Sequence, residues 1–159
     1  MKKRKLVFAT LAIVWMGIIF LFSSRTSDVS TNDSNGIGLL IGKTFVSNFE
    51  EWNEERQMEF AQNIDHPIRK TAHALEYALL GVLLTGAFVD EKNRRKARIL
   101  IPWGLGTFYA ATDEFHQLFV PGRSGQVSDV ALDSVGVLLG VLIVIILYSK
   151  RTKNTKVEK

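Results

Sequence analysis

Residues 6–22 read LVFATLAIVWMGIIFLF, a run of 17 residues that contains no charge. A helix needs roughly 17–25 mostly apolar residues to cross the hydrocarbon core of a bilayer, because each residue advances it by about 1.5 Å. A helix is also the one open-ended element that satisfies its own backbone hydrogen bonds in lipid. The run therefore predicts a transmembrane helix over about 6–23.

Three further apolar runs follow, and they decide the class of the whole chain. They are Tyr77–Val89, Ile99–Thr112 and Val130–Ser149, the last interrupted only by Asp133. We therefore predict an all-α membrane protein with four transmembrane helices over about 6–23, 70–89, 98–117 and 129–148. At 159 residues, the chain is predicted to be a single membrane domain over 1–159.

The first run also invites comparison with a cleaved signal peptide, because KKRK at residues 2–5 is a good basic n-region. However, the apolar stretch is longer than a typical h-region, and LFSSR at residues 21–25 offers no A-x-A-like cleavage site. An uncleaved membrane anchor is the favoured interpretation.

The basic residues predict the orientation. Residues 2–5, 90–98 and 150–159 together carry +11, which leaves −7 for the rest of a chain whose net charge is +4. Because Lys and Arg accumulate on the cytoplasmic side, both termini and the 90–98 loop are predicted to be cytoplasmic in a multi-pass cell-membrane protein. Nucleic acid is therefore not an expected partner, since the basic residues serve as topology signals. The absence of Cys excludes disulfides and a Cys nucleophile.

The segment 24–69 is then external. Residues 28–38 are rich in Ser, Thr, Asn and Gly and are predicted to form a loop. Apolar residues at three- and four-residue spacing predict a short amphipathic helix on the outer membrane surface. These residues are Ile37, Leu40, Ile41, Phe45, Phe49 and Trp52. His66-Pro67 is expected to break the chain before the second span.

Ionisable groups are costly within spans, so each one calls for an explanation. With the predicted topology, all of them fall in the outer leaflet or at its edge. They are Arg69, Lys70, His73 and Glu76 entering the second span, Asp113, Glu114 and His116 ending the third beside the polar Gln117, Arg123 in the next loop, and Asp129 and Asp133 opening the fourth. Ser23 and Ser24 end the first span at the same level.

Helical spacing groups these residues further. Three sets each share one helical face: Arg69 with His73 and Glu76, Asp113 with His116 and Gln117, and Asp129 with Asp133. These faces can point into one pocket, whereas Glu114 is turned by about 100° from Asp113. The turn PGRSG at residues 121–125 could bring Arg123 over that pocket.

Such a pocket offers several kinds of chemistry. Two His with carboxylates could ligate a metal or act as general acids and bases, and the cations could hold a phosphate. A metal is not favoured, because the spacing lacks a compact motif such as H-E-x-x-H, and the cofactor is unknown. The plain alternative is a polar network that locks the helices together. The candidate catalytic residues are His73, Glu76, Asp113, Glu114 and His116, and the candidate substrate-binding residues are Arg69, Lys70, Tyr77, Gln117, Arg123, Asp129 and Asp133.

Two segments carry a family resemblance. RKTAHALEY at residues 69–77, followed by Leu80-Gly81, resembles the first signature of the VanZ-like family. DEFHQLFVPGR at residues 113–123, followed by Ser124-Gly125 and Asp129, resembles the second, and Phe22-Ser-Ser24 resembles the end of its first helix. The resemblance is close over about 70–140 and extends to the whole chain in layout and size.

The resemblance implies a small bacterial four-helix membrane protein. The family is named for a protein that raises resistance to teicoplanin, a glycopeptide that carries an acyl chain. Because membership of a family does not determine function, the resemblance identifies candidate site residues but assigns no role to any of them. These are Arg69, His73, Glu76, Tyr77, Asp113, Glu114, His116, Gln117, Arg123 and Asp129.

Two hypotheses of function remain open. In the first, the protein is an envelope enzyme acting on a lipid or a lipid-linked wall precursor, and it contributes to teicoplanin resistance. Arg69 and Arg123 would then hold the anion, His116 or His73 would be the general base or acid, oriented by Asp113 or Glu76, and water, Ser23 or Ser24 would be the nucleophile. In the second, it is a non-enzymatic binder of a lipoglycopeptide or lipid headgroup, or a structural envelope-assembly factor.

Overall fold

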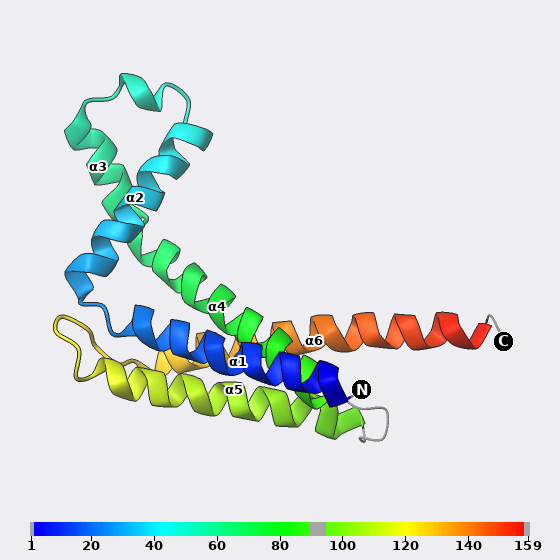
Figure 1. The fold of residues 1–159 in the computed structure, drawn as a ribbon. Helices are drawn as coiled ribbons and strands as arrows, with labels where there is room; N and C mark the ends of the chain where they lie inside the picture. Colours follow the sequence, from blue (N-terminus) through cyan, green and yellow to red (C-terminus); the bar gives the residue numbers. More distant parts are fainter. Residues whose placement is uncertain (1, 90–94, 158–159) are drawn as a thin grey trace.

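The computed structural model describes residues 2–89 and 95–157, and in this part of the chain all regular secondary structure is helical (Figure 1). The elements are α1 (Lys2–Ser23), α2 (Ser27–Phe45), the short 3-10 helix η1 (Phe49–Glu51), α3 (Glu54–Asn63), α4 (Asp65–Phe88), α5 (Arg95–Gln117) and α6 (Val127–Val157). Residues 90–94 of the predicted basic loop, together with residues 1 and 158–159, lie outside the described residues. The all-α prediction is confirmed.

Three helices of the described chain are long and apolar enough to cross a membrane: α1, α4 and α6 as far as Ser149. These three correspond to the first, second and fourth predicted spans. The third, α5, is long enough at 23 residues, but Arg98, Asp113 and Glu114 lie within the predicted span. The number of spans therefore stays a prediction, although α5 packs against both α4 and α6.

The most extensive packing joins α4 to α6. Glycines make this close approach possible: a Cβ on Gly136 would lie 2.4 Å from the Ala74 carbonyl oxygen, and one on Gly140 would lie 2.0 Å from that of Ala78. Small residues at this spacing let membrane helices approach backbone to backbone. Gly136 and Gly140, four residues apart on α6, therefore set the register in which α6 packs on α4.

Hydrogen bonds from Trp and Tyr side chains link the other helices. The Trp15 indole on α1 donates to the Glu76 carbonyl at 2.9 Å, and the Tyr109 hydroxyl on α5 donates to the Met16 carbonyl at 2.6 Å. Trp103 on α5 donates to the Ser134 hydroxyl at 3.0 Å. Each polar tip finds an acceptor on a neighbouring helix, as buried Trp and Tyr generally must.

Between α1 and α4, the elements α2, η1 and α3 form a helical arm (Figure 1). The prediction of a loop over 28–38 was wrong, because these residues belong to α2. The Ser34 hydroxyl donates to the Ser30 carbonyl within α2 and also bonds the Asp65 carboxylate on α4, whereas the buried Asn35 Oδ1 has no partner among the described residues. Gly38 allows close contact with α3, where a Cβ would lie 2.9 Å from the Ala61 Cα.

The predicted amphipathic helix is found only in part. α2 ends at Phe45, and Phe49 is buried in η1 against Trp52 and Phe60 instead of continuing the exposed stripe. Leu40 and Phe45 remain exposed on α2. Whether this face lies on a membrane surface stays a prediction.

The chain break expected at His66-Pro67 falls earlier, at Ile64. α4 begins at Asp65, which places Pro67 in its first turn. A proline is tolerated there because the backbone N–H that it lacks has no partner within the helix. α4 therefore extends five residues before the predicted start at 70, and this extra turn carries Arg69.

Candidate functional site

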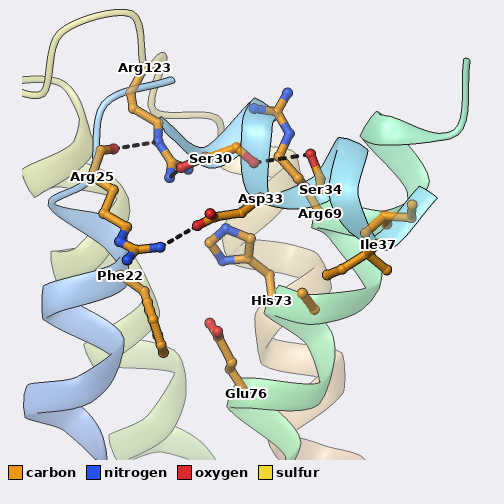
Figure 2. A pocket seen from close by; sticks show the side chains of 12 residues that line it. Phe22, Arg25, Ser30, Asp33, Ser34, Ile37, Arg69, His73, Glu76 and Arg123 are labelled. Atoms are coloured by element: carbon orange, nitrogen blue, oxygen red, sulfur yellow. Dashed lines mark hydrogen bonds and ion pairs between the residues drawn. The ribbon is translucent and has the colours of Figure 1, made fainter. Parts of the chain in front are cut away.

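A cavity of about 230 Å³, which we call the amphipathic cavity, lies between α1, α2 and α4 (Figure 2). It combines charged side chains with apolar ones. Its lining consists of Phe22, Arg25, Ser30, Asp33, Ser34, Ile37, Ile68, Arg69, Ala72, His73, Glu76 and Arg123. Figure 2 shows His73 and Glu76 projecting into it from α4, with the Arg25–Asp33 ion pair opposite.

A second, smaller cavity of about 110 Å³ lies beside it, and we call it the polar cavity. Its lining consists of Ser27, His66, Arg69, Lys70, His73, Gln117, Gly122, Arg123, Ser124, Gln126 and Asp129. Three residues belong to both linings: Arg69, His73 and Arg123. These three therefore stand where the two cavities adjoin.

The two shared arginines have different partners. Arg69 pairs with Asp65 at 3.2 Å, one turn earlier on α4. Arg123 donates to the Arg25 carbonyl at 3.2 Å and to the Ser30 hydroxyl at 2.5 Å, and no described carboxylate forms an ion pair with it. Burial and the neighbouring Arg69 guanidinium lower the pKa of Arg123 from its ordinary value. Three carboxylates partly offset this lowering of the pKa without forming an ion pair with Arg123, and they are those of Asp113, Glu114 and Glu76. A half-buried cation that is hydrogen-bonded only to neutral groups favours the approach of an anion.

The turn after α5 positions Arg123. Gly122 adopts a φ of 74°, a left-handed conformation that suits glycine, and the Arg123 amide donates to the Val120 carbonyl at 3.1 Å. Glu114 supports the same turn by accepting a hydrogen bond from the Gln126 amide at 2.9 Å. The predicted swing of the 121–125 turn thus brings the arginine to the cavities, and Glu114 faces the turn.

An ion pair closes one side of the polar cavity. Lys70 on α4 lies 3.0 Å from Asp129 at the start of α6, with both side chains partly exposed. Gln117 at the end of α5 also lines this cavity and bonds the Asp113 carboxylate at 3.4 Å. Predicted residues from the second span, the third span, the loop and the fourth span thus meet here.

Other predicted residues lie deeper. Tyr77 and Asp133 are 0% exposed and Asp113 is 3% exposed, and none of them lines either cavity. In the described chain, both oxygens of Asp133, Oδ1 of Asp113 and the Tyr77 hydroxyl have no hydrogen-bond partner. They form a buried polar layer between α4, α5 and α6. Because buried polar groups are normally hydrogen-bonded, these unpartnered oxygens are costly, and the layer is not the satisfied network that would lock the helices together.

His116 stands apart from both linings. Its Nε2 lies 3.2 Å from the Ser24 hydroxyl, and its ring packs on Phe20 at 4.6 Å between centroids. The Ser24 hydroxyl also donates to the Phe20 carbonyl at 2.6 Å, which occupies its single proton. With the hydroxyl proton on the Phe20 carbonyl, His116 Nε2–H donates to Ser24, whereas the other histidine tautomer accepts that proton from Ser24.

A protein-family comparison decides the relationship. The VanZ/LLP1 family model matches residues 8–148, which is most of the chain. The chain belongs to the VanZ/LLP1 family. No curated protein and no solved structure matches it.

In this VanZ/LLP1 membrane protein, the two recognised segments come together around the cavities. Arg69 and His73 from the first segment and Gln117 and Arg123 from the second all line the polar cavity. The matched region also includes α2, whose contribution the sequence analysis missed. Ser30, Asp33, Ser34 and Ile37 line the amphipathic cavity. Their spacing of i, i+3, i+4 and i+7 is a helical face, and this signal was available in a segment dismissed for its composition.

The described part of this VanZ/LLP1 protein holds no ready metal site. Among residues 2–89 and 95–157, no group of three or more His, Asp or Glu side chains is gathered as metal ligands. The chemistry that the cavities do offer is anion binding by two guanidiniums, with one imidazole between them that can exchange a proton.

Proposed function

We propose that this VanZ/LLP1 membrane protein binds the phosphate-bearing headgroup of an envelope amphiphile between Arg69, His73 and Arg123. One observation carries the proposal: the guanidiniums of Arg69 and Arg123 line both cavities, and among the described residues Arg123 has only neutral hydrogen-bond partners. Guanidinium groups match phosphate oxygens in bidentate geometry. The apolar side chains of the amphipathic cavity, Ile37 and Ile68 among them, suit the start of a lipid chain.

We place this site at the outer leaflet of the cell membrane, in a four-span chain with both termini in the cytoplasm. The basic residues at 2–5, 90–98 and 150–159 support this orientation. α4 then runs inward from the site and α5 runs outward to it. The ligand would be a membrane lipid or a lipid-linked wall precursor that reaches the site laterally.

For an enzyme acting on such a ligand, His73 is the residue placed for proton transfer. It lines both cavities, and Glu76 lies one turn away on the same face of α4. His73 would accept a proton from an attacking water or hydroxyl and return it to the leaving group, while the arginines stabilise the phosphate charge.

A non-enzymatic binder is the second candidate, and one observation favours it. In the described chain, no hydrogen bond fixes the His73 imidazole, whereas catalytic His side chains are usually oriented by a partner. A binder would hold a lipid headgroup or an acylated glycopeptide such as teicoplanin without converting it. Either activity could underlie a contribution to teicoplanin resistance.

Binding by the purified protein tests the headgroup proposal. Phosphatidic acid and diacylglycerol with the same acyl chains would be titrated in detergent against wild type, Arg123→Gln and Arg56→Gln. Arg56 is the matched control because it lies on the arm, stacked on Trp52. We expect Arg123→Gln to lose about tenfold or more in phosphatidic acid affinity, as for a charged hydrogen bond. Equal affinity for the two lipids in wild type would refute the proposal.

Turnover separates the two candidates. Purified wild type and His73→Gln would be incubated with radiolabelled envelope lipids, and product would be sought by chromatography. Product from wild type alone supports an enzyme, and binding without product supports the binder. In parallel, teicoplanin susceptibility of a sensitive Gram-positive host expressing wild type, Arg123→Ala or His73→Ala would link the site to the drug, with membrane abundance measured for each.

A further inference from the structure

We infer that the phosphate held by Arg69, His73 and Arg123 is a phosphodiester, with its lipid side in the amphipathic cavity and a hydroxylated substituent in the polar cavity. This inference rests on the proposed headgroup site and specifies the chemical class of its ligand. It concerns the part of the ligand beyond the phosphate.

The arrangement of the cavities is the first argument. They adjoin at the same three residues, so an anion bound there faces two spaces, of about 230 and 110 Å³. A phosphomonoester has one organic substituent and would leave the second space to water. A phosphodiester has two substituents on opposite sides of its phosphate and can place one in each cavity.

The contrast between the linings is the second argument. The amphipathic cavity includes Phe22, Ile37 and Ile68. In the polar cavity, every lining residue except Gly122 carries a hydrogen-bonding side chain. Apolar walls favour a lipid chain, whereas a wall made of donors and acceptors favours a solute that can pair with them.

The polar cavity also offers donors and acceptors side by side. The Lys70–Asp129 pair, at 3.0 Å, supplies both kinds of group, and the Gln126 side-chain amide donates to the Ser124 hydroxyl at 3.3 Å. A hydroxyl group is both donor and acceptor, so neighbouring hydroxyls can pair with such a wall. A glycerol headgroup and a sugar on a lipid-linked wall precursor share this chemistry.

Neutral substitutions in the polar cavity test the inference without altering the charge around the phosphate. Gln126→Leu and Ser124→Ala remove hydrogen-bonding side chains, and the Gln126 backbone amide can still bond Glu114. Gln62→Leu, on the exposed surface of α3, is the matched control. Each protein would be titrated with phosphatidylglycerol and with phosphatidic acid of the same acyl chains, then with polyprenyl-phosphate sugar and with polyprenyl phosphate.

We expect the two cavity variants to lose threefold to about tenfold in affinity for a phosphodiester and less than twofold for the matching monoester. Loss confined to phosphatidylglycerol identifies a glycerol headgroup, and loss confined to the glycosylated polyprenyl lipid identifies a sugar. Equal loss for monoester and diester, or no loss for either diester, would overturn the inference and leave the headgroup site intact. Failure of wild type to bind any phosphate lipid better than diacylglycerol would instead refute the headgroup site itself.

Discussion

The Nε1 of Trp15 on α1 donates a hydrogen bond to the backbone carbonyl of Glu76 on α4, at 2.9 Å. This bond ties α1 to the helical turn whose side chains line the amphipathic cavity, since Glu76 and His73 lie on that turn. Helix α1 is therefore bonded to the turn of α4 that carries His73 and Glu76, and it also contributes Phe22 to the lining of the amphipathic cavity.

Trp15→Phe should therefore weaken both stability and ligand binding. We expect a loss of about 0.5–1.5 kcal/mol in the free energy of unfolding in mixed micelles, the usual contribution of one hydrogen bond. Trp103→Phe is the control, because Trp103 bonds Ser134 away from the cavities. It should lower stability by a similar amount and leave headgroup affinity unchanged. Identical binding by the two variants would argue against a role for α1 in the site.

The glycines of α6 provide a test of the packing. A Cβ at residue 140 would lie 2.0 Å from the Ala78 carbonyl oxygen, so Gly140→Ala should push α6 away from α4 and cost about 1–3 kcal/mol in unfolding free energy. A Cβ at Gly104 on α5 would meet nothing within 4 Å. Gly104→Ala should leave stability unchanged or raise it, because alanine is the better helix former. Equal stability of the two variants would contradict the close approach of α4 and α6.

The apolar runs predicted α1, α4 and α6 because length and hydropathy alone determine whether a helix can cross lipid. Helical spacing also predicted that Arg69, His73 and Glu76 share a face, and all three line the amphipathic cavity. These features depend on local sequence, and they could be predicted without a structure.

Other features depend on contacts between distant segments and could not be predicted. Composition suggested a loop over 28–38, but these residues form the helix α2. Tertiary contacts hold it in place: Ser34 bonds Asp65 on α4, and Gly38 packs closely against Ala61 on α3. Likewise, helical spacing could not show that Gln117 would face the polar cavity while Asp113 lies buried beside Tyr77. That choice is set by the rotation of α5 against its neighbours.

Asp133 provides a test of the buried polar layer. Its side chain is fully buried, and neither carboxylate oxygen has a hydrogen-bond partner in the described chain. Removing the capacity for charge with Asp133→Asn should leave the unfolding free energy unchanged or raise it by up to about 2 kcal/mol. Asp129→Asn, which breaks the partly exposed pair with Lys70, should instead cost up to about 1 kcal/mol. A clear loss of stability in Asp133→Asn would show that the carboxylate has a partner in the folded protein.

Cysteine labelling tests whether α5 crosses the membrane. The chain has no Cys, so Lys3→Cys and Ser124→Cys each introduce a single reactive thiol. Lys3 lies in the first turn of α1 and Ser124 follows α5, so the three long helices α1, α4 and α5 separate the two positions. If all three cross, the two positions lie on opposite sides, and a membrane-impermeant maleimide should label Ser124→Cys in intact cells and Lys3→Cys only after lysis. If α5 does not cross, both positions lie on the same side and should label alike. Labelling of Lys3→Cys alone in intact cells would reverse the orientation and place the arginine site in the cytoplasm.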